Sequence, residues 1–202
     1  MEQKTNIPIE QLDRTRSTPL IQAWYEIVHL KHMFRQGWLK RGVPRDACET
    51  VAEHTFGNAM LCLLLLADRP ELDGYKVLRL ALVHDLGEAY VGDITPHDNV
   101  DRADKIRMET AAVREILDKL PNGASLIADW DEYEAQQSAE ARFVKEIDRM
   151  ELALQASVYD QRGLVDATEF YDAVTPTIQS ADLKVVLQAL RGLSQEQKRE
   201  TE

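Results

Sequence analysis

Apolar residues recur along this chain at intervals of three and four positions, which is the spacing of a helix that buries one face. No segment keeps the two-residue alternation of a half-buried strand. The spacing predicts helices over residues 19–28, 50–68, 75–90, 101–120, 138–159, 166–173 and 180–193. The segment 126–133 is ambiguous. The pattern therefore predicts an all-α fold, a single-domain helical bundle.

Local signals support several of these boundaries. Thr18 precedes Pro19, which suits the first position of a helix, and Thr50 followed by Glu53 forms a capping-box pattern. Glycine and proline between positions 37 and 44 interrupt the helical spacing and predict a loop. We expect residues 1–17 to form an N-terminal arm, 18–194 the domain with its C-terminal helices, and 195–202 a frayed tail.

Composition fits a globular protein and narrows its partners. Of the 202 residues, 44% are apolar and 29% are charged, and the formal net charge of −11 argues against a nucleic-acid or anionic-membrane partner. No apolar run approaches the ~20 residues of a membrane span. The chain opens without the basic and apolar regions of a signal peptide, so we expect Cys48 and Cys62 to be reduced thiols in a cytoplasmic protein.

One stretch departs from the acidic average. Residues 27–45 contain no acidic side chain, and they include the basic residues Lys31, Arg35, Lys40, Arg41 and Arg45. Such a stretch suits a phosphate group, or else it forms a solvated basic face that pairs with acidic neighbours. Both interpretations stay open at this point.

The segment 80–96 carries the strongest candidate chemistry. Its apolar residues end in the pair His84-Asp85, which is costly to bury unless a partner compensates the polar atoms. A divalent metal ion is such a partner. We therefore interpret His84 and Asp85 as half of a metal site.

Residues at the borders of apolar helix faces can supply the other half. His54 lies in the first turn of one predicted helix and Asp148 borders the buried face of another, although each alone would more often be an ordinary hydrogen-bonded residue. Together with His84 and Asp85 they form a set of two histidines and two aspartates from three helices. This set suits one divalent ion, such as Mn, Co, Mg, Fe or Zn. It contains no cysteine, which argues against a structural zinc site.

Two further acidic residues follow in the same segment. Glu88 lies four residues after His84 and three after Asp85, so a continuous helix would place all three on nearly one face. There Glu88 can accept a proton from a water molecule whose pKa a metal ion lowers; otherwise it faces solvent. Asp93 either ends the helix or accepts a hydrogen bond from a sugar hydroxyl.

The order His54, His84-Asp85, Asp148 resembles the H…HD…D signature of the HD-domain metal-dependent phosphohydrolases. The similarity extends over residues 20–160 and is strongest in the blocks 37–43, 49–54, 83–88, 92–96 and 140–151. These blocks resemble one subgroup, the HD-domain 5′-deoxynucleotidases, of both the bacterial and the eukaryotic type.

The resemblance implies a role for each matching residue. The implied metal ligands are His54, His84, Asp85 and Asp148. Glu88 matches the catalytic carboxylate, which works with the water that attacks phosphorus. Asp93 matches an aspartate that contacts the substrate.

The same resemblance implies how sugar and phosphate are recognised. Trp38 matches a tryptophan that crowds the 2′ position of the sugar and thereby favours deoxyribose. In the bacterial type an arginine stands next to that tryptophan, but here Gly37 does. The implied phosphate-binding role therefore passes to Arg35 or Arg41.

By this resemblance, the chain is expected to release phosphate from 2′-deoxynucleoside 5′-monophosphates through a metal-activated water, and to form a homodimer. One alternative is an HD-type hydrolase of another nucleotide, such as a deoxynucleoside triphosphate, a cyclic nucleotide or an alarmone. Another is a non-catalytic nucleotide-binding module. Glu88 argues against the latter, because a sensor has no need of that carboxylate.

Overall fold

The structure is a computed structural model that describes residues 2–4 and 6–201. Within these residues every regular element is helical, and strand-like pairing is limited to isolated bridges between Gln3 and Met33 and between Phe34 and Thr50. The predicted all-α fold is therefore confirmed. No helix in this part of the chain has the length and apolar character needed to span a membrane.

The longer helices are, in chain order, α1 (Pro19–Ile27), α3 (Val51–Leu65), α4 (Gly74–Val83), α6 (Arg102–Leu117), α7 (Gly123–Ala135), α8 (Ala139–Gln161), α9 (Thr168–Val174) and α10 (Ala181–Thr201). The shorter ones are α2 (Gln36–Leu39) and α5 (Glu88–Val91). Single 3₁₀ turns are η1 (Pro8–Gln11), η2 (Val28–Lys31), η3 (Leu66–Asp68), η4 (Pro96–Asp98) and η5 (Thr175–Thr177).

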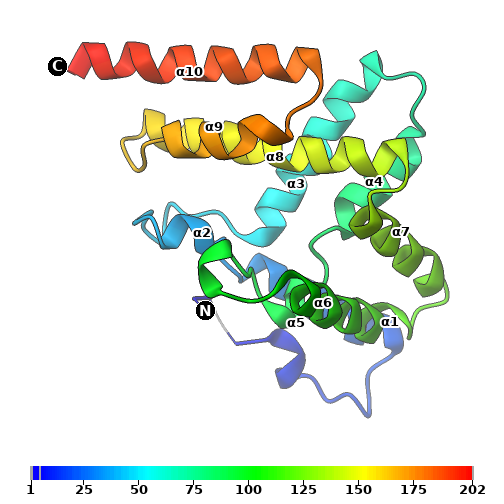
Figure 1. Cartoon of the computed structure of the whole chain (residues 1–202). Coiled ribbons are helices and arrows are strands. Elements are labelled where there is room, and N and C mark those ends of the chain that lie inside the picture. Colours follow the sequence, from blue (N-terminus) through cyan, green and yellow to red (C-terminus); the bar gives the residue numbers. More distant parts are fainter. Residues whose placement is uncertain (1, 5, 202) are drawn as a thin grey trace.

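The helices form two groups, each with its own hydrophobic core. Helices α8, α9 and α10 lie side by side at one end of the molecule, α1, α5 and α6 gather at the other, and α3 and α4 run between them (Figure 1). Val144 of α8 belongs to the first core, whereas Val51 and Val83 belong to the second. Ala81 of α4 belongs to the first core, so His84, which directly follows Val83, lies where the two cores meet, and the His54 ring packs against it.

A capping box sets the start of α3, as predicted. Thr50 Oγ1 accepts a hydrogen bond from Glu53 N at 3.3 Å, and Thr50 N donates to Glu53 Oε2 at 2.6 Å. These bonds satisfy two backbone groups that the first turn would otherwise leave without partners. The cap thereby holds His54 in the first turn of the helix.

The continuous helix predicted over residues 75–90 is wrong. Helix α4 ends at Val83, α5 begins at Glu88, and the turn between them is tightened by hydrogen bonds of the i to i+3 type, such as Glu88 N to Asp85 O at 3.0 Å. Gly87 lies in this turn against α6, where an added Cβ would stand 2.7 Å from Glu109 Cβ. The close approach of α6 requires a residue without a side chain and favours the break.

Other boundaries also differ from the predictions. The ambiguous segment 126–133 is helical and forms part of α7, and α10 continues to Thr201 through the range predicted to be a frayed tail. The N-terminal arm is attached to α2, because Gln36 Nε2 donates to Glu2 O at 2.8 Å. Three residues of the predicted arm and tail, at positions 1, 5 and 202, lie outside the described residues.

Candidate metal centre

His54 lies beside two aspartates from different helices. Its Nε2 is 3.3 Å from Asp148 Oδ1 of α8 and 3.5 Å from Asp85 Oδ2 of the turn after α4. The ring is 1% exposed. The capping box of α3 and the long helix α8 thus bring together residues that are almost a hundred positions apart.

His84 completes the cluster from the end of α4. Its Nε2 lies 3.3 Å from Asp85 Oδ2, and its ring meets that of His54 edge to face with 5.5 Å between centroids. One ligand atom from each of His54, His84 and Asp85 lies within 4.8 Å of the other two. The structure therefore brings together the four residues predicted as ligands, with Asp148 in contact with His54.

The donor atoms of this cluster fit a metal ion. The buried Nε2 atoms of both histidines and Oδ2 of Asp85 have no hydrogen-bond partner among the described residues, although they lie close to one another. The opposite ring nitrogens are engaged: His54 Nδ1 contacts Glu151 Oε2 at 2.6 Å, and His84 Nδ1 contacts Ala81 O at 2.8 Å. Metal-binding histidines are commonly held in this way, with the outer nitrogen bonded to the protein and the inner one free.

The charges of the cluster favour a cation at its centre. Burial and Arg35 lower the pKa of His54, but the neighbouring carboxylates of Asp148 and Glu151 outweigh them and raise this pKa to about 10. For Asp148, burial raises the pKa, whereas Lys145 and His54 lower it well below its usual value. The second oxygen of Asp148 lies 3.2 Å from Lys145 Nζ. The acidic groups therefore stabilise positive charge at this point.

Glu88 lies next to the cluster at the start of α5. The side chain is buried, and Oε1 lies 3.8 Å from Lys105 Nζ of α6. Among the residues that the structure describes, none forms a hydrogen bond with Oε2. Burial raises the pKa of Glu88 well above its usual value, and the charges of Asp85 and Asp93 raise it further. A carboxylate with these properties can take up a proton near neutral pH.

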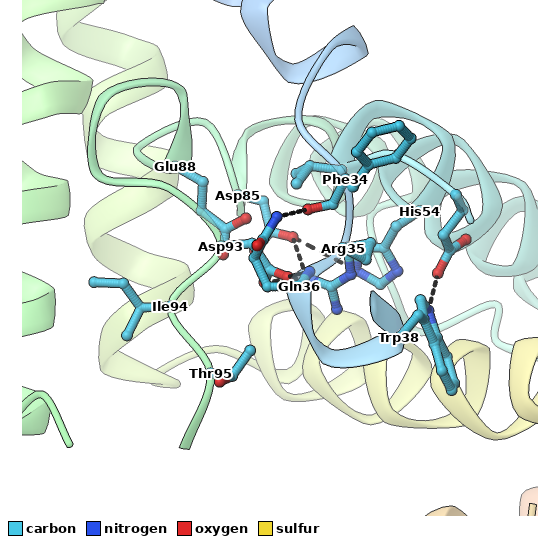
Figure 2. Close-up of polar contacts among 12 residues, drawn as sticks. Phe34, Arg35, Gln36, Trp38, His54, Asp85, Glu88, Asp93, Ile94 and Thr95 are labelled. Atoms are coloured by element: carbon cyan, nitrogen blue, oxygen red, sulfur yellow. Dashed lines mark hydrogen bonds and ion pairs between the residues drawn. The ribbon is translucent and has the colours of Figure 1, made fainter. Parts of the chain in front are cut away.

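Asp93 and Arg35 form a contact beside the cluster (Figure 2). Arg35 Nη1 lies 2.9 Å from Asp93 Oδ1 and 3.8 Å from Asp85 Oδ2, while Gln36 N donates to Asp93 Oδ2 at 2.5 Å. Both oxygens of Asp93 thus have protein partners. Burial lowers the pKa of Arg35, but Asp93 and Asp85 raise it well above its usual value.

The structure places Trp38 and Arg41 farther from the cluster. The Trp38 ring, 2% exposed, packs against Tyr159 and Phe170, and Nε1 donates to Glu49 Oε1 at 2.7 Å, the dashed line at Trp38 in Figure 2. Arg41 pairs with Glu169, and its guanidinium lies over the Phe170 ring at 4.7 Å. Of the two candidate arginines, the one in contact with the cluster is Arg35.

Sequence reasoning missed several residues that support the site. Glu151 holds the outer nitrogen of His54, Lys145 pairs with Asp148, and Lys105 lies beside Glu88. A signal was present for two of them: Lys145 and Glu151 lie three residues before and after Asp148, on the same side of α8. For Lys105 the sequence offers no such signal, because the packing of α6 on α5 decides its position.

The structure is a helical bundle with a candidate metal-binding cluster of imidazole and carboxylate groups between its two cores. The family model described as HD domain matches residues 27–190. That range includes more than half of the chain and all the residues of the cluster, so the chain belongs to the HD-domain family.

Comparison with known proteins gives relatives of similar length. The chain is 41% identical over 143 residues to the 5′-deoxynucleotidase HDDC2 of Homo sapiens, which covers 70% of this chain and 68% of the relative. It is 34% identical over 177 residues to the 5′-deoxynucleotidase YGK1 of Saccharomyces cerevisiae, with 83% and 80% covered.

Solved structures show the same fold. The PH0347 protein of Pyrococcus horikoshii OT3 superposes with a TM-score of 0.70 at 29% identity and covers 84% of this chain and 97% of its own. A predicted metal-dependent phosphohydrolase of Magnetospirillum magnetotacticum MS-1 gives a TM-score of 0.68 at 27% identity, with 88% and 92% covered.

Proposed function

We propose that this chain is a metal-dependent hydrolase that releases phosphate from 2′-deoxynucleoside 5′-monophosphates. The observation that carries the proposal is the buried cluster in which the inner nitrogens of His54 and His84 and an oxygen of Asp85 have no hydrogen-bond partner in the described part of the chain. The names of the relatives, 5′-deoxynucleotidases from human and yeast, support the substrate class.

In this proposal, four residues hold one divalent ion: His54, His84, Asp85 and Asp148. When bound, the ion would supply a Lewis acid that polarises the phosphate and lowers the pKa of water. Manganese, cobalt, magnesium, iron and zinc all suit a set of imidazole and carboxylate ligands.

Glu88 is the proposed catalytic residue. Its buried carboxylate with a raised pKa takes a proton from the attacking water while the water oxygen bonds to phosphorus. The bond between phosphorus and O5′ breaks, the leaving oxygen takes up a proton from solvent, and Glu88 returns its proton to solvent. Lys105, 3.8 Å from Glu88 Oε1, keeps the carboxylate in place.

Arg35 is the proposed phosphate-binding arginine, because it contacts Asp85 and Asp93 whereas Arg41 is paired with Glu169. Asp93 is proposed to accept a hydrogen bond from the sugar. Each carboxylate oxygen has two acceptor sites, so the bonds from Arg35 and from Gln36 N leave capacity for one more donor. Trp38 is proposed to exclude the 2′-hydroxyl by fixing the position of α2, since its own ring is buried.

We further infer a cytoplasmic homodimer that binds no nucleic acid. The net charge of −11 supports the last point. The exposed apolar side chains of α3, with Phe56 and Leu64 each 67% exposed, support a protein partner for this face.

The test is phosphate release by the purified protein loaded in turn with Mn²⁺, Co²⁺, Mg²⁺, Fe²⁺ or Zn²⁺. We expect inorganic phosphate from deoxynucleoside monophosphates, less from ribonucleoside monophosphates, and none after chelation. Pyrophosphate or triphosphate released from nucleoside triphosphates, without activity on monophosphates, would overturn the proposed substrate. Binding of a deoxynucleotide without turnover under any of these ions would overturn the proposed reaction.

A further inference from the structure

Glu151 lies behind the cluster, on the side of the His54 ring opposite to Asp85 and Asp148. It projects from α8, and its Oε2 is 2.6 Å from His54 Nδ1. Both residues are buried, with 8% of Glu151 and 1% of His54 exposed. A buried carboxylate placed at the outer nitrogen of an imidazole accepts the proton of that nitrogen and leaves the inner nitrogen free to bind a ligand.

Helix α3 leaves room for this carboxylate. At Gly57, three residues after His54, an added Cβ would lie 2.6 Å from Glu151 Oε1 and 3.4 Å from its Cδ. A glycine inside a helix costs about 1 kcal/mol relative to alanine, so a glycine at this position needs a reason. The close approach of Glu151 supplies it.

The two histidines of the cluster are supported differently. His84 Nδ1 contacts the neutral carbonyl of Ala81, three residues earlier in α4, whereas His54 Nδ1 contacts a carboxylate from another helix. Glu49 also lies near His54, but its Oε1 accepts a hydrogen bond from Trp38 Nε1. Glu151 is therefore the charged partner of the outer nitrogen.

We propose that Glu151 is a positioning residue for His54. It fixes the tautomer with the proton at Nδ1, orients the ring so that Nε2 faces Asp85 and Asp148, and increases the affinity of Nε2 for a metal ion. Gly57 is part of the same arrangement, because it admits the carboxylate. The proposal rests on the proposed metal centre and goes beyond its four ligands.

Metal affinity tests the proposal without an activity assay. Mn²⁺ is titrated into the full chain, and free ion is measured by electron paramagnetic resonance. We expect Glu151→Ala to weaken Mn²⁺ binding about 10- to 100-fold, the range typical of outer partners of metal ligands. The Mn²⁺ affinity of Glu151→Gln should lie between those of the unaltered chain and of Glu151→Ala, because the amide oxygen still accepts a hydrogen bond from His54 Nδ1 but carries no charge. Gly57→Ala should also weaken binding, because its Cβ displaces the carboxylate.

The matched control is Glu49→Gln, which changes a carboxylate near the same ring that does not bond to it. We expect its Mn²⁺ affinity to stay close to that of the unaltered chain. An equal loss in Glu49→Gln and Glu151→Gln would show that the general acidity of the region matters and would overturn the proposal. If the unaltered chain binds a second Mn²⁺ ion, and both Glu49→Gln and Glu151→Gln abolish binding of that ion, then Glu151 is a ligand of a second ion and not a positioning residue.

Nitrogen-15 NMR of the Zn²⁺-loaded protein gives an independent readout. The unaltered chain should show the His54 proton at Nδ1, and Glu151→Gln should weaken the hydrogen bond of that proton. Thermal unfolding with chelator present establishes that each variant is folded; if Glu151→Ala is not, the Gln and Gly57→Ala variants carry the test. Equal affinity in all variants overturns the role of Glu151 alone, whereas no metal binding by the unaltered chain overturns the centre itself.

Discussion

Two neighbouring polar regions of this molecule differ in how their atoms are used. In the cluster of His54, His84 and Asp85, three buried polar atoms lie close together, and none of them forms a hydrogen bond with the residues that the structure describes. In the contact of Arg35 with Asp93, both carboxylate oxygens have donors from the protein. Asp85 belongs to the first region and lies 3.8 Å from Arg35 of the second.

The difference indicates which of the two regions has polar atoms available to bind a ligand. Buried polar atoms without hydrogen bonds destabilise the folded state, and a bound ligand that interacts with them would offset this loss. A region with its hydrogen bonds complete needs no ligand to be stable, and it sets the geometry of its neighbour. Changes in the first region should therefore remove function, and changes in the second should mainly alter stability and selectivity.

The largest effect is expected from His84→Ala. This change removes one ligand nitrogen from the cluster, so bound metal and phosphate release should both fall to background. Metal content is measured by mass spectrometry after dialysis against the ion. The control is His97→Ala, an exposed histidine outside the cluster, which should keep both properties. Normal metal content in His84→Ala would remove this residue from the ligand set.

Glu88→Gln should separate metal binding from turnover. The amide cannot take a proton from water, so kcat should fall about 10²- to 10⁴-fold while metal content is kept. The substitution also removes a buried carboxylate whose pKa is raised, and it should leave thermal stability equal or higher. Turnover at the normal rate would show that the proton goes elsewhere.

Arg35→Ala should act on stability as well as on substrate affinity. It leaves Asp93 buried without its charged partner, which costs about 3–5 kcal/mol for a buried pair. Denaturant unfolding measures the loss, and KM for the monophosphate should rise. The double variant with Asp93→Ala should be less destabilised than the sum of the single variants, because the unpaired charge is gone.

Arg41→Ala is the matched control for that arginine. Its partner Glu169 is exposed, and pairs of this kind contribute about 0–1 kcal/mol. KM should stay near its original value. A rise in KM with Arg41→Ala but not with Arg35→Ala would show that Arg41, and not Arg35, binds the phosphate.

The sequence predicted the helices well where local chemistry determines them. The capping box predicted at Thr50 is present, and α8 begins one residue after the predicted start at Ser138, whose side chain accepts a hydrogen bond from Ala141 N. Val158 of α8 lies at helical spacing from the buried Val144 and Ile147, but it is 51% exposed. Helical spacing shows that a residue lies on a face, but it does not show how far along the helix a neighbour covers that face.

The residues of the candidate site could be predicted from the sequence more completely than the ends of the helices that carry them. The residue types His54, His84, Asp85 and Asp148 limited the chemistry whatever the exact helix ends. The break between α4 and α5 could not be predicted, because it depends on the approach of α6 to Gly87, a contact between distant segments. The contact of Glu151 with His54 also joins distant segments, and the sequence indicated only that Glu151 lies on the same side of α8 as Asp148.

Among the residues with a proposed role, the smallest effect on activity is expected from Trp38→Phe, which tests how a buried ring influences sugar selectivity. Phenylalanine keeps the contact with Tyr159 and Phe170 but loses the hydrogen bond to Glu49, which should cost about 1–3 kcal/mol of unfolding free energy. If Trp38 fixes the position of α2, the ratio of kcat/KM for deoxyribonucleotides over ribonucleotides should decrease by less than tenfold, which corresponds to less than about 1.4 kcal/mol.

Trp38→Leu extends the same measurement, because it removes the ring and should narrow the ratio more than Trp38→Phe. Glu49→Gln retains the ring and an acceptor for Nε1, so it should leave the ratio unchanged. If both Trp38 variants lose stability while the ratio stays constant, Trp38 serves the hydrophobic core alone. Sugar selectivity would then depend on the contact of Arg35 with Asp93. This hydrogen-bonded region would still determine which substrate binds at the proposed metal site.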